Sequence, residues 1–229
     1  MKPVHLRSLT LAAVALAVVA GSAGAQEKPG RLLSTLEVRE LVARAEPADH
    51  TRLAEHFTAL ADRYTTDANK HLSMSKSFVG NPNRNVGSGM SVHCRRLAEL
   101  NTQEATTVRE LATFHEKLAA GAPASPPRDS ARFEGGTGAP APTEKELNAL
   151  AAKAGTPAEH RALEEYFRTL AKRYTAEASD HTTLAMTYRG TRIAQAAVIH
   201  DRLTGLARDA AKEATAAAEM HRQLATVGR

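Results

Sequence analysis

Imidazole and thiol side chains recur in this chain at one regular spacing. They form four pairs, each 21 residues apart: His50–His71, Cys94–His115, His160–His181 and His200–His221. An α-helix advances ~100° per residue, and helices in a left-handed bundle repeat every ~3.5 residues, so both members of a pair lie on one helix face. Rising ~1.5 Å per residue, they stand ~31 Å apart along the helix. Histidine and cysteine are ligands of zinc and copper, so the spacing predicts metal-binding layers inside a helical bundle.

The numbering of the pairs also predicts which side chains face each other. In a hairpin of two antiparallel helices, residues at the same height have residue numbers with a constant sum. This rule pairs His50 with His115, His71 with Cys94, His160 with His221, and His181 with His200. If the two hairpins pack together, we expect two four-ligand layers. One layer contains His50, His115, His160 and His221, and the other contains His71, Cys94, His181 and His200.

The layer that contains the single cysteine has further soft groups beside it. Met74 lies one turn from His71, and Met90 lies one turn from Cys94, which favours Cu(I) over zinc. Two acids, Asp67 and Glu177, each precede a histidine by four residues and are placed to orient its imidazole. The alternative interpretation is that the histidines are polar core residues without a ligand.

The elements that carry these residues form two copies of one unit. Capping boxes predict short helices that begin at Ser34 and Thr143. Two long amphipathic segments follow each short helix, at about 47–78 and 88–120 in the first copy. The first segment matches the chain 110 residues later, and the second matches at an offset of 106. The prediction is an all-α four-helix bundle built from two tandem antiparallel helical hairpins, each preceded by a short helix.

Composition divides the rest of the chain. Residues 1–25 have a basic start, an apolar stretch and the sequence Ala23-Gly24-Ala25, which together predict a signal peptide cleaved after Ala25. We therefore expect a periplasmic or secreted protein. Its predicted parts are a leader (26–33), helical repeat 1 (34–120), a flexible Pro/Gly linker (121–142) and helical repeat 2 (143–229).

Charge and motifs exclude several classes of function. The net charge of +5 is spread along the chain and aromatic residues make up only 4%, so we expect no nucleic-acid partner. After the signal peptide, no apolar run approaches the ~20 residues of a membrane-spanning helix. Nucleophile, phosphate-loop, dinucleotide and di-iron carboxylate motifs are missing, so we predict that the protein is not an enzyme. Cys-x-x-Cys-His is also missing, which leaves non-covalent haem b, held by two histidines, as an alternative cofactor.

Three short segments resemble those of uncharacterised exported helical proteins of bacteria. They are His71-Leu72-Ser73-Met74, Val92-His93-Cys94 and Phe114-His115-Glu116-Lys117-Leu118. This resemblance covers the mature chain and implies no activity. The His-x-x-Met of the first segment is also similar to copper-associated helical proteins of the periplasm, which implies copper as a ligand. The third segment departs from that pattern, because leucine follows its histidine at the methionine position.

Two functions follow from these observations. We predict an exported helical-bundle protein that binds a transition metal, copper or zinc, through the eight paired residues for storage, buffering or delivery. The alternative is a non-catalytic structural or partner-binding module of the cell envelope. In that case the linker would let the hairpins form a homodimer or engage an envelope protein.

Overall fold

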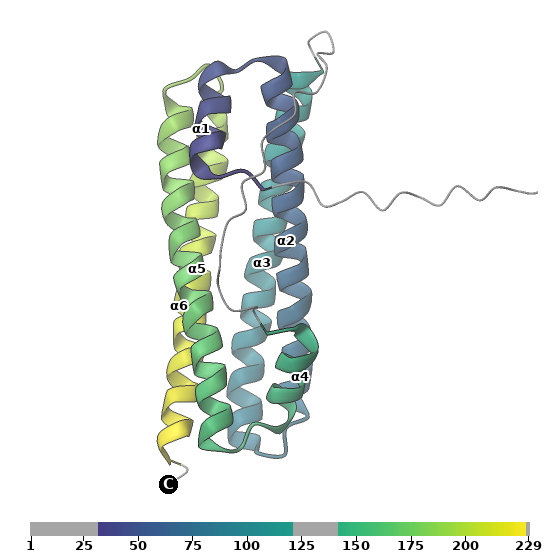
Figure 1. The fold of residues 1–229 in the computed structure, drawn as a ribbon, viewed down its shortest axis with the longest axis vertical. Helices are drawn as coiled ribbons and strands as arrows, with labels where there is room; N and C mark the ends of the chain where they lie inside the picture. The colour runs from purple at the N-terminus through teal and green to yellow at the C-terminus, as the bar shows by residue number, and fades with distance from the viewer. Residues whose placement is uncertain (1–31, 121–141, 228–229) are drawn as a thin grey trace, which may run out of the picture.

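The computed structural model describes residues 32–120 and 142–227, and these ranges are all-helical. The helices are α1 (Thr35–Arg44), α2 (Pro47–Val79), α3 (Arg84–Ala119), α4 (Glu144–Lys153), α5 (Pro157–Arg189) and α6 (Gln195–Val227) (Figure 1). The predicted all-α class is therefore confirmed. The predicted signal peptide, most of the leader and nearly all of the linker lie outside the described residues.

The short helices begin where the sequence predicts them. At α1, Ser34 Oγ accepts a hydrogen bond from the Glu37 amide at 3.3 Å, and the Glu37 carboxylate accepts one from the Ser34 amide at 2.8 Å. At α4, Thr143 and Glu146 make the same reciprocal pair, at 3.3 and 2.7 Å. Each capping box satisfies amide groups that the first helical turn would leave unpaired, which fixes the start of the helix.

One boundary differs from the prediction. Helix α3 begins at Arg84 rather than near Ser88. The Asn81 side chain accepts a hydrogen bond from the Asn83 amide at 2.9 Å, so the chain reverses within the turn that follows α2. A turn this tight leaves the next residues free to continue directly into the helix.

The long helices pack as two antiparallel pairs, α2 with α3 and α5 with α6. The pairs meet through α3 and α6, whereas no described Cα atom of α2 comes within 8 Å of one in α5. Figure 1 shows that α2 starts at the end of the molecule where α5 finishes. The turn of each hairpin therefore lies beside the open end of the other.

Small side chains explain the close approach of α3 and α6. Helix α6 buries a run of alanines: Ala196, Ala197, Ala207, Ala210, Ala214 and Ala217. On α3, a Cβ atom added to Gly89 would lie 2.6 Å from Met220 Cε of α6. The distance between packed helices depends on the size of the side chains between them, so the alanines let the two backbones approach, while Gly89 makes room for the Met220 side chain.

The two short helices fill the wider side between α2 and α5. Helix α1 packs against α5 and α2, and α4 packs against α2 and α5, so each short helix contacts the hairpin of the other repeat. The Asn81 side chain holds α4 in place by donating to the carbonyls of Ala151 at 3.0 Å and Ala154 at 3.2 Å. Asn148 of α4 also donates to Ser73 Oγ of α2 at 2.7 Å.

We predict that Asn81→Ala destabilises the protein by about 1–3 kcal/mol, because it leaves two carbonyl groups near the end of α4 without their donor. The free energy of unfolding in urea measures the effect. Asn83→Ala is the matched control, because Asn83 is exposed and its side chain does not cap α3. Equal stability of the two variants would contradict the role given to Asn81.

Candidate functional site: the buried histidine pairs

Three of the four predicted side-chain pairs are in direct contact. His50 Nδ1 lies 3.1 Å from His115 Nδ1 across the first hairpin. In the second hairpin, the Nδ1 atoms of His160 and His221 and those of His181 and His200 are each 3.2 Å apart. All six residues are buried. Matching residues by height along each hairpin therefore identified the correct partners.

The fourth predicted pair has a different environment. His71 and Cys94 are both buried, with exposed fractions of 1% and 0%. Cys94 is a free thiol. His71 Nδ1 has no hydrogen-bond partner among the described residues. Cys94 occupies the position that corresponds to His200 in the second repeat, so a shorter thiol side chain replaces an imidazole there.

The predicted grouping of the pairs into two four-ligand layers is wrong. His115 Nε2 is hydrogen-bonded to Tyr188 Oη at 2.8 Å, and Tyr188 lies at the end of α5, beside the turn of the second hairpin. The His50–His115 pair therefore shares its end of the molecule with His181–His200, not with His160–His221. The prediction failed because it assumed that the two hairpins point the same way, whereas they pack in opposite directions.

Aromatic rings also keep neighbouring pairs apart. The His115 ring centroid lies 5.6 Å from that of Phe57 and 5.9 Å from that of Tyr188. The same two rings lie 5.8 and 5.1 Å from His200. In the described residues, no three His, Cys, Asp or Glu side chains converge in a metal-binding arrangement. The interior therefore holds separate two-residue layers.

The opposite end repeats this arrangement with two substitutions. Phe167 and Phe78 pack on His221, with centroid distances of 5.8 and 5.9 Å. In the repeat alignment Phe78 corresponds to Tyr188, so the hydroxyl that bonds His115 is missing here. His221 Nε2 accordingly has no partner among the described residues. The second substitution is Cys94, which corresponds to His200.

Hydrogen bonding assigns the same tautomers to all three pairs. Each pair shares one hydrogen between two Nδ1 atoms, so one ring donates and the other accepts. The inner rings of His115, His200 and His221 are 0% exposed. Among these, His115 Nε2 can accept from the Tyr188 hydroxyl, and the other two Nε2 atoms have no partner in the described chain. An unpartnered acceptor costs less than an unpartnered N–H group, so the inner rings are the Nδ1–H donors.

Burial keeps these imidazoles neutral. It lowers the pKa of His115 to about 3, with further lowering from His50 and His56. Burial likewise lowers the pKa of His221 to about 3, and those of His71 and His181 to about 4. At neutral pH each ring therefore retains a nitrogen lone pair that can bind a metal ion.

A polar layer crosses the middle of the molecule between α2 and α5. Arg63 bonds Glu177 at 2.7 Å, and Arg173 bonds Asp67 at 2.8 Å. Tyr64 also donates to Glu177, at 3.2 Å. The two acids were expected to orient His181 and His71, and that expectation is wrong because arginines of the facing helix are their hydrogen-bond partners. The long arginine side chains span the gap between the two helices, a distance that the sequence pattern could not indicate.

Glu104 is a further buried carboxyl group in this layer. It is 0% exposed, and neither of its oxygens has a hydrogen-bond partner among the described residues. Burial and then the negative charge of Glu177 raise its pKa to about 8. The corresponding residue of the second repeat is Ala210. Glu104 therefore carries a proton at neutral pH.

Sequence reasoning gave no role to His56 and His93, and the structure gives both a place. His56 Nδ1 accepts a hydrogen bond from the Leu33 amide at 3.0 Å. It also lines a cavity of about 110 Å³ between α1, α2 and α5, whose wall includes Tyr64 and His181. His93 Nδ1 lies 2.5 Å from a carboxylate oxygen of Glu213, which links α3 to α6. Neither has a histidine counterpart in the second repeat, which carries Tyr166 and Ile199 at these positions, so the repeat pattern gave no signal for them.

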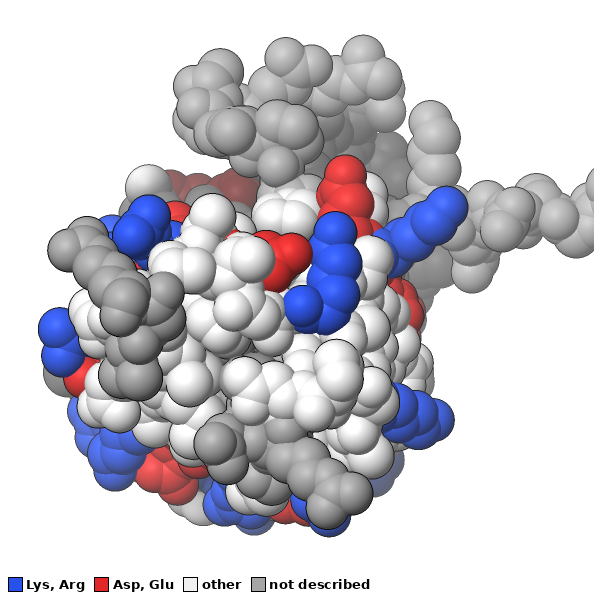
Figure 2. Space-filling model, turned by 90° about the horizontal axis from the view of Figure 1, so that it is seen from below, with Lys and Arg blue, Asp and Glu red and all other residues white. Residues whose placement is uncertain are grey.

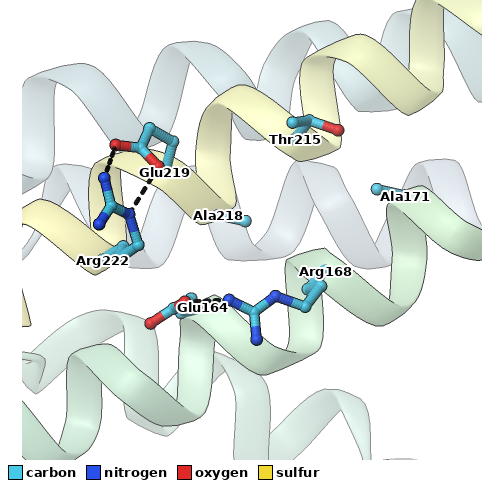
Figure 3. A pocket seen from close by; sticks show the side chains of 7 residues that line it. All are labelled: Glu164, Arg168, Ala171, Thr215, Ala218, Glu219 and Arg222. Carbon is cyan, nitrogen blue, oxygen red and sulfur yellow. Dashed lines mark hydrogen bonds and ion pairs between the residues drawn. The ribbon is translucent and has the colours of Figure 1, made fainter.

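Surface charge is mostly paired and of mixed sign. Figure 2 shows acidic and basic side chains interspersed around the rim of one end of the molecule. A hollow of about 150 Å³ lies between α5 and α6 (Figure 3), and its charged groups pair along their own helices, Glu164 with Arg168 and Glu219 with Arg222. These ion pairs neutralise its lining, so the hollow is a poor candidate for a charged ligand. In the described residues, no helix is both long and apolar enough to cross a bilayer.

Comparison of the chain with protein-family models, with curated proteins and with solved structures finds no match in any of the three. The function must therefore be inferred from the geometry of the buried pairs.

We predict that the protein loses stability as the pH falls from about 6.5 towards 4. The folded-state pKa of each buried histidine lies below its unfolded value, so the unfolded chain binds more protons over this range and acid favours unfolding. Urea denaturation at several pH values measures the slope, and His71→Leu should reduce it because it removes one titrating group. Constant stability across the range would contradict burial of the neutral rings.

Glu104→Gln should stabilise the protein at pH 9 by more than at pH 6. The pKa of Glu104 is raised from 4.5 to about 8 in the folded protein. The stability that its proton contributes is therefore fully present below pH 4.5, falls as the pH rises above that value, and is lost once the pH has passed through about 8. Glutamine keeps the shape and cannot ionise. Denaturant midpoints at both pH values measure the difference, with Glu99→Gln, exposed on the same helix, as control. A pH-independent difference would show that Glu104 does not ionise in this range.

Proposed function

We propose that the protein binds a transition-metal ion, copper or zinc, at a buried histidine pair, and that it stores, buffers or delivers that ion. The supporting observation is the contact of two neutral imidazoles through Nδ1, at 3.1 Å for His50 and His115. Two nitrogens bound at ~2.0–2.1 Å to one tetrahedral ion stand ~3.3–3.4 Å apart. The observed pair is close to this spacing, so a small outward shift would admit an ion in place of the shared hydrogen.

His50–His115 is the pair best suited to this exchange. When a metal replaces the shared hydrogen, each ring must carry its remaining hydrogen on Nε2. For His115 that hydrogen has an acceptor, because Tyr188 Oη lies 2.8 Å from Nε2. Metal-bound histidines are commonly oriented by such a partner. At His200 and His221 the same change would leave an N–H group without a partner among the described residues, at a cost of ~1–3 kcal/mol.

A site with two protein ligands suits exchange better than permanent binding. Structural zinc sites are closed by four protein ligands, whereas sites with open positions accept other ligands. Two imidazoles leave positions for water or for a donor from another molecule. In this proposal the two tandem hairpins form one four-helix bundle that holds the pair. Residues 1–25 direct export of the protein to the periplasm or out of the cell.

Haem is less favoured than a bare ion by the same geometry. Two axial histidines stand on opposite faces of a planar macrocycle, so a slot must separate them. The paired nitrogens here are within 3.2 Å of each other.

The alternative is a structural or partner-binding module whose histidine pairs only hold the helices in register. The shared-hydrogen tautomers favour it, because each pair makes a hydrogen bond with no ion present. It predicts that chelators leave the melting temperature unchanged, and that molecular size depends on protein concentration or on an envelope partner.

The two repeats provide matched variants for a test. Titration of apo-protein with Zn(II) and Cu(I) should reveal a site that His50→Ala removes and His160→Ala leaves intact. Tyr188→Phe should weaken that site about tenfold, because it removes the partner of His115 Nε2. Phe78→Tyr should strengthen binding at His160–His221 by giving His221 the missing hydroxyl.

Calorimetry and competition with a chromogenic chelator measure these affinities, and circular dichroism checks that each variant is folded. Zn(II) binding that His50→Ala does not change, or no binding at millimolar metal, would reject the proposal and favour the structural alternative.

A further inference from the structure

We infer that His71, Cys94 and the thioethers of Met74 and Met90 form a second site, which binds a soft monovalent cation of the Cu(I) type. This site shares no residue with His50–His115, and its proposal does not depend on metal binding there. It lies at the other end of the first hairpin, in the half of the core that α4 covers.

Burial brings these groups together in one dry region. Cys94, Met74 and Met90 are each 0% exposed and belong to the same core cluster. His71 stands opposite Cys94 in the hairpin, as His181 stands opposite His200. Tyr166 of the second hairpin packs on this region, with its ring centroid 6.4 Å from that of His71.

An unpartnered nitrogen points to a ligand in this region. His71 Nδ1 is buried and has no hydrogen-bond partner among the described residues. In the equivalent position of the second repeat, His181 Nδ1 meets His200 Nδ1 at 3.2 Å. Cysteine is shorter than histidine and has no ring nitrogen, so Cys94 at the position of His200 leaves His71 Nδ1 without the partner that His181 Nδ1 has. An ion between nitrogen and sulfur would satisfy both.

Charge selects a monovalent ion. A Cys94 thiolate and one monovalent cation make a neutral pair, whereas a divalent cation would leave a net positive charge in the core. Uncompensated charge in a region of low dielectric is costly. Thiolate and thioether ligands also prefer Cu(I). Burial raises the pKa of the Cys94 thiol, so the free site holds a protonated thiol and binding must release that proton to solvent.

The test is an anaerobic titration of the reduced full chain with Cu(I), in competition with a chromogenic Cu(I) chelator. In the His50→Ala chain, where the Cys94 site remains, we expect one Cu(I) to bind with a thiolate-to-copper charge-transfer band in the ultraviolet and release of one proton. Cys94→Ser should abolish the band and weaken binding by more than about a hundredfold, since loss of even an outer partner costs ~10–100-fold. Met74→Leu and Met90→Leu should keep the band and weaken binding several-fold.

Cys94→His is the second variant, because histidine is the residue that the other repeat carries at this position. It should fold with a fourth histidine pair, lose the charge-transfer band and lose its preference for Cu(I) over Zn(II). His50→Ala should leave the Cu(I) site at Cys94 unchanged, so failure of one site is distinguishable from failure of the other. With His50→Ala also present, unchanged Cu(I) affinity after Cys94→Ser or Cys94→His, or Cu(I) binding without the band when Cys94 is intact, would overturn the inference.

Discussion

The close packing of α3 against α6 is the contact on which the rest of the molecule depends. Alanines on α6 let this helix approach α3, while α2 and α5 stay farther apart. Because the hairpins meet in opposite directions, the turn of one lies beside the open end of the other. This direction sets the neighbours of every buried polar side chain. It puts Tyr188 beside His115 and leaves room for α1 and α4 on the opposite side.

Buried polar groups are tolerated here because most of them satisfy one another. Two neutral imidazoles need only one hydrogen between them, so each pair satisfies both of its Nδ1 atoms internally. In the middle layer, arginines reach across the wider side to the acids of the facing helix. Among the exceptions are the carboxyl group of Glu104 and Nδ1 of His71, which lack hydrogen-bond partners in the described chain. Such groups are costly to bury, which is why they are the places to look for a proton or a ligand.

Three of the differences between the two repeats fall at or beside the buried polar groups. Tyr188 replaces Phe78 beside a histidine pair, His200 replaces Cys94 within one, and Ala210 replaces Glu104 in the middle layer. At the remaining pair positions both repeats keep histidine. The two ends therefore differ in chemistry: one combines two imidazole pairs with a phenol, and the other combines one imidazole pair with a further histidine, a thiol and thioethers.

The sequence by itself determined the helices, their capping boxes and the partners within each hairpin. These depend on local periodicity and on the height of residues along two connected helices, and both can be read from residue numbers. His50 with His115 and His181 with His200 were predictable for that reason. Only the tertiary structure decided which pairs share an end of the molecule, because the apolar pattern is the same whichever way two hairpins pack. It also decided that Asp67 and Glu177 bond arginines, since the separation of α2 and α5 depends on the small side chains between α3 and α6.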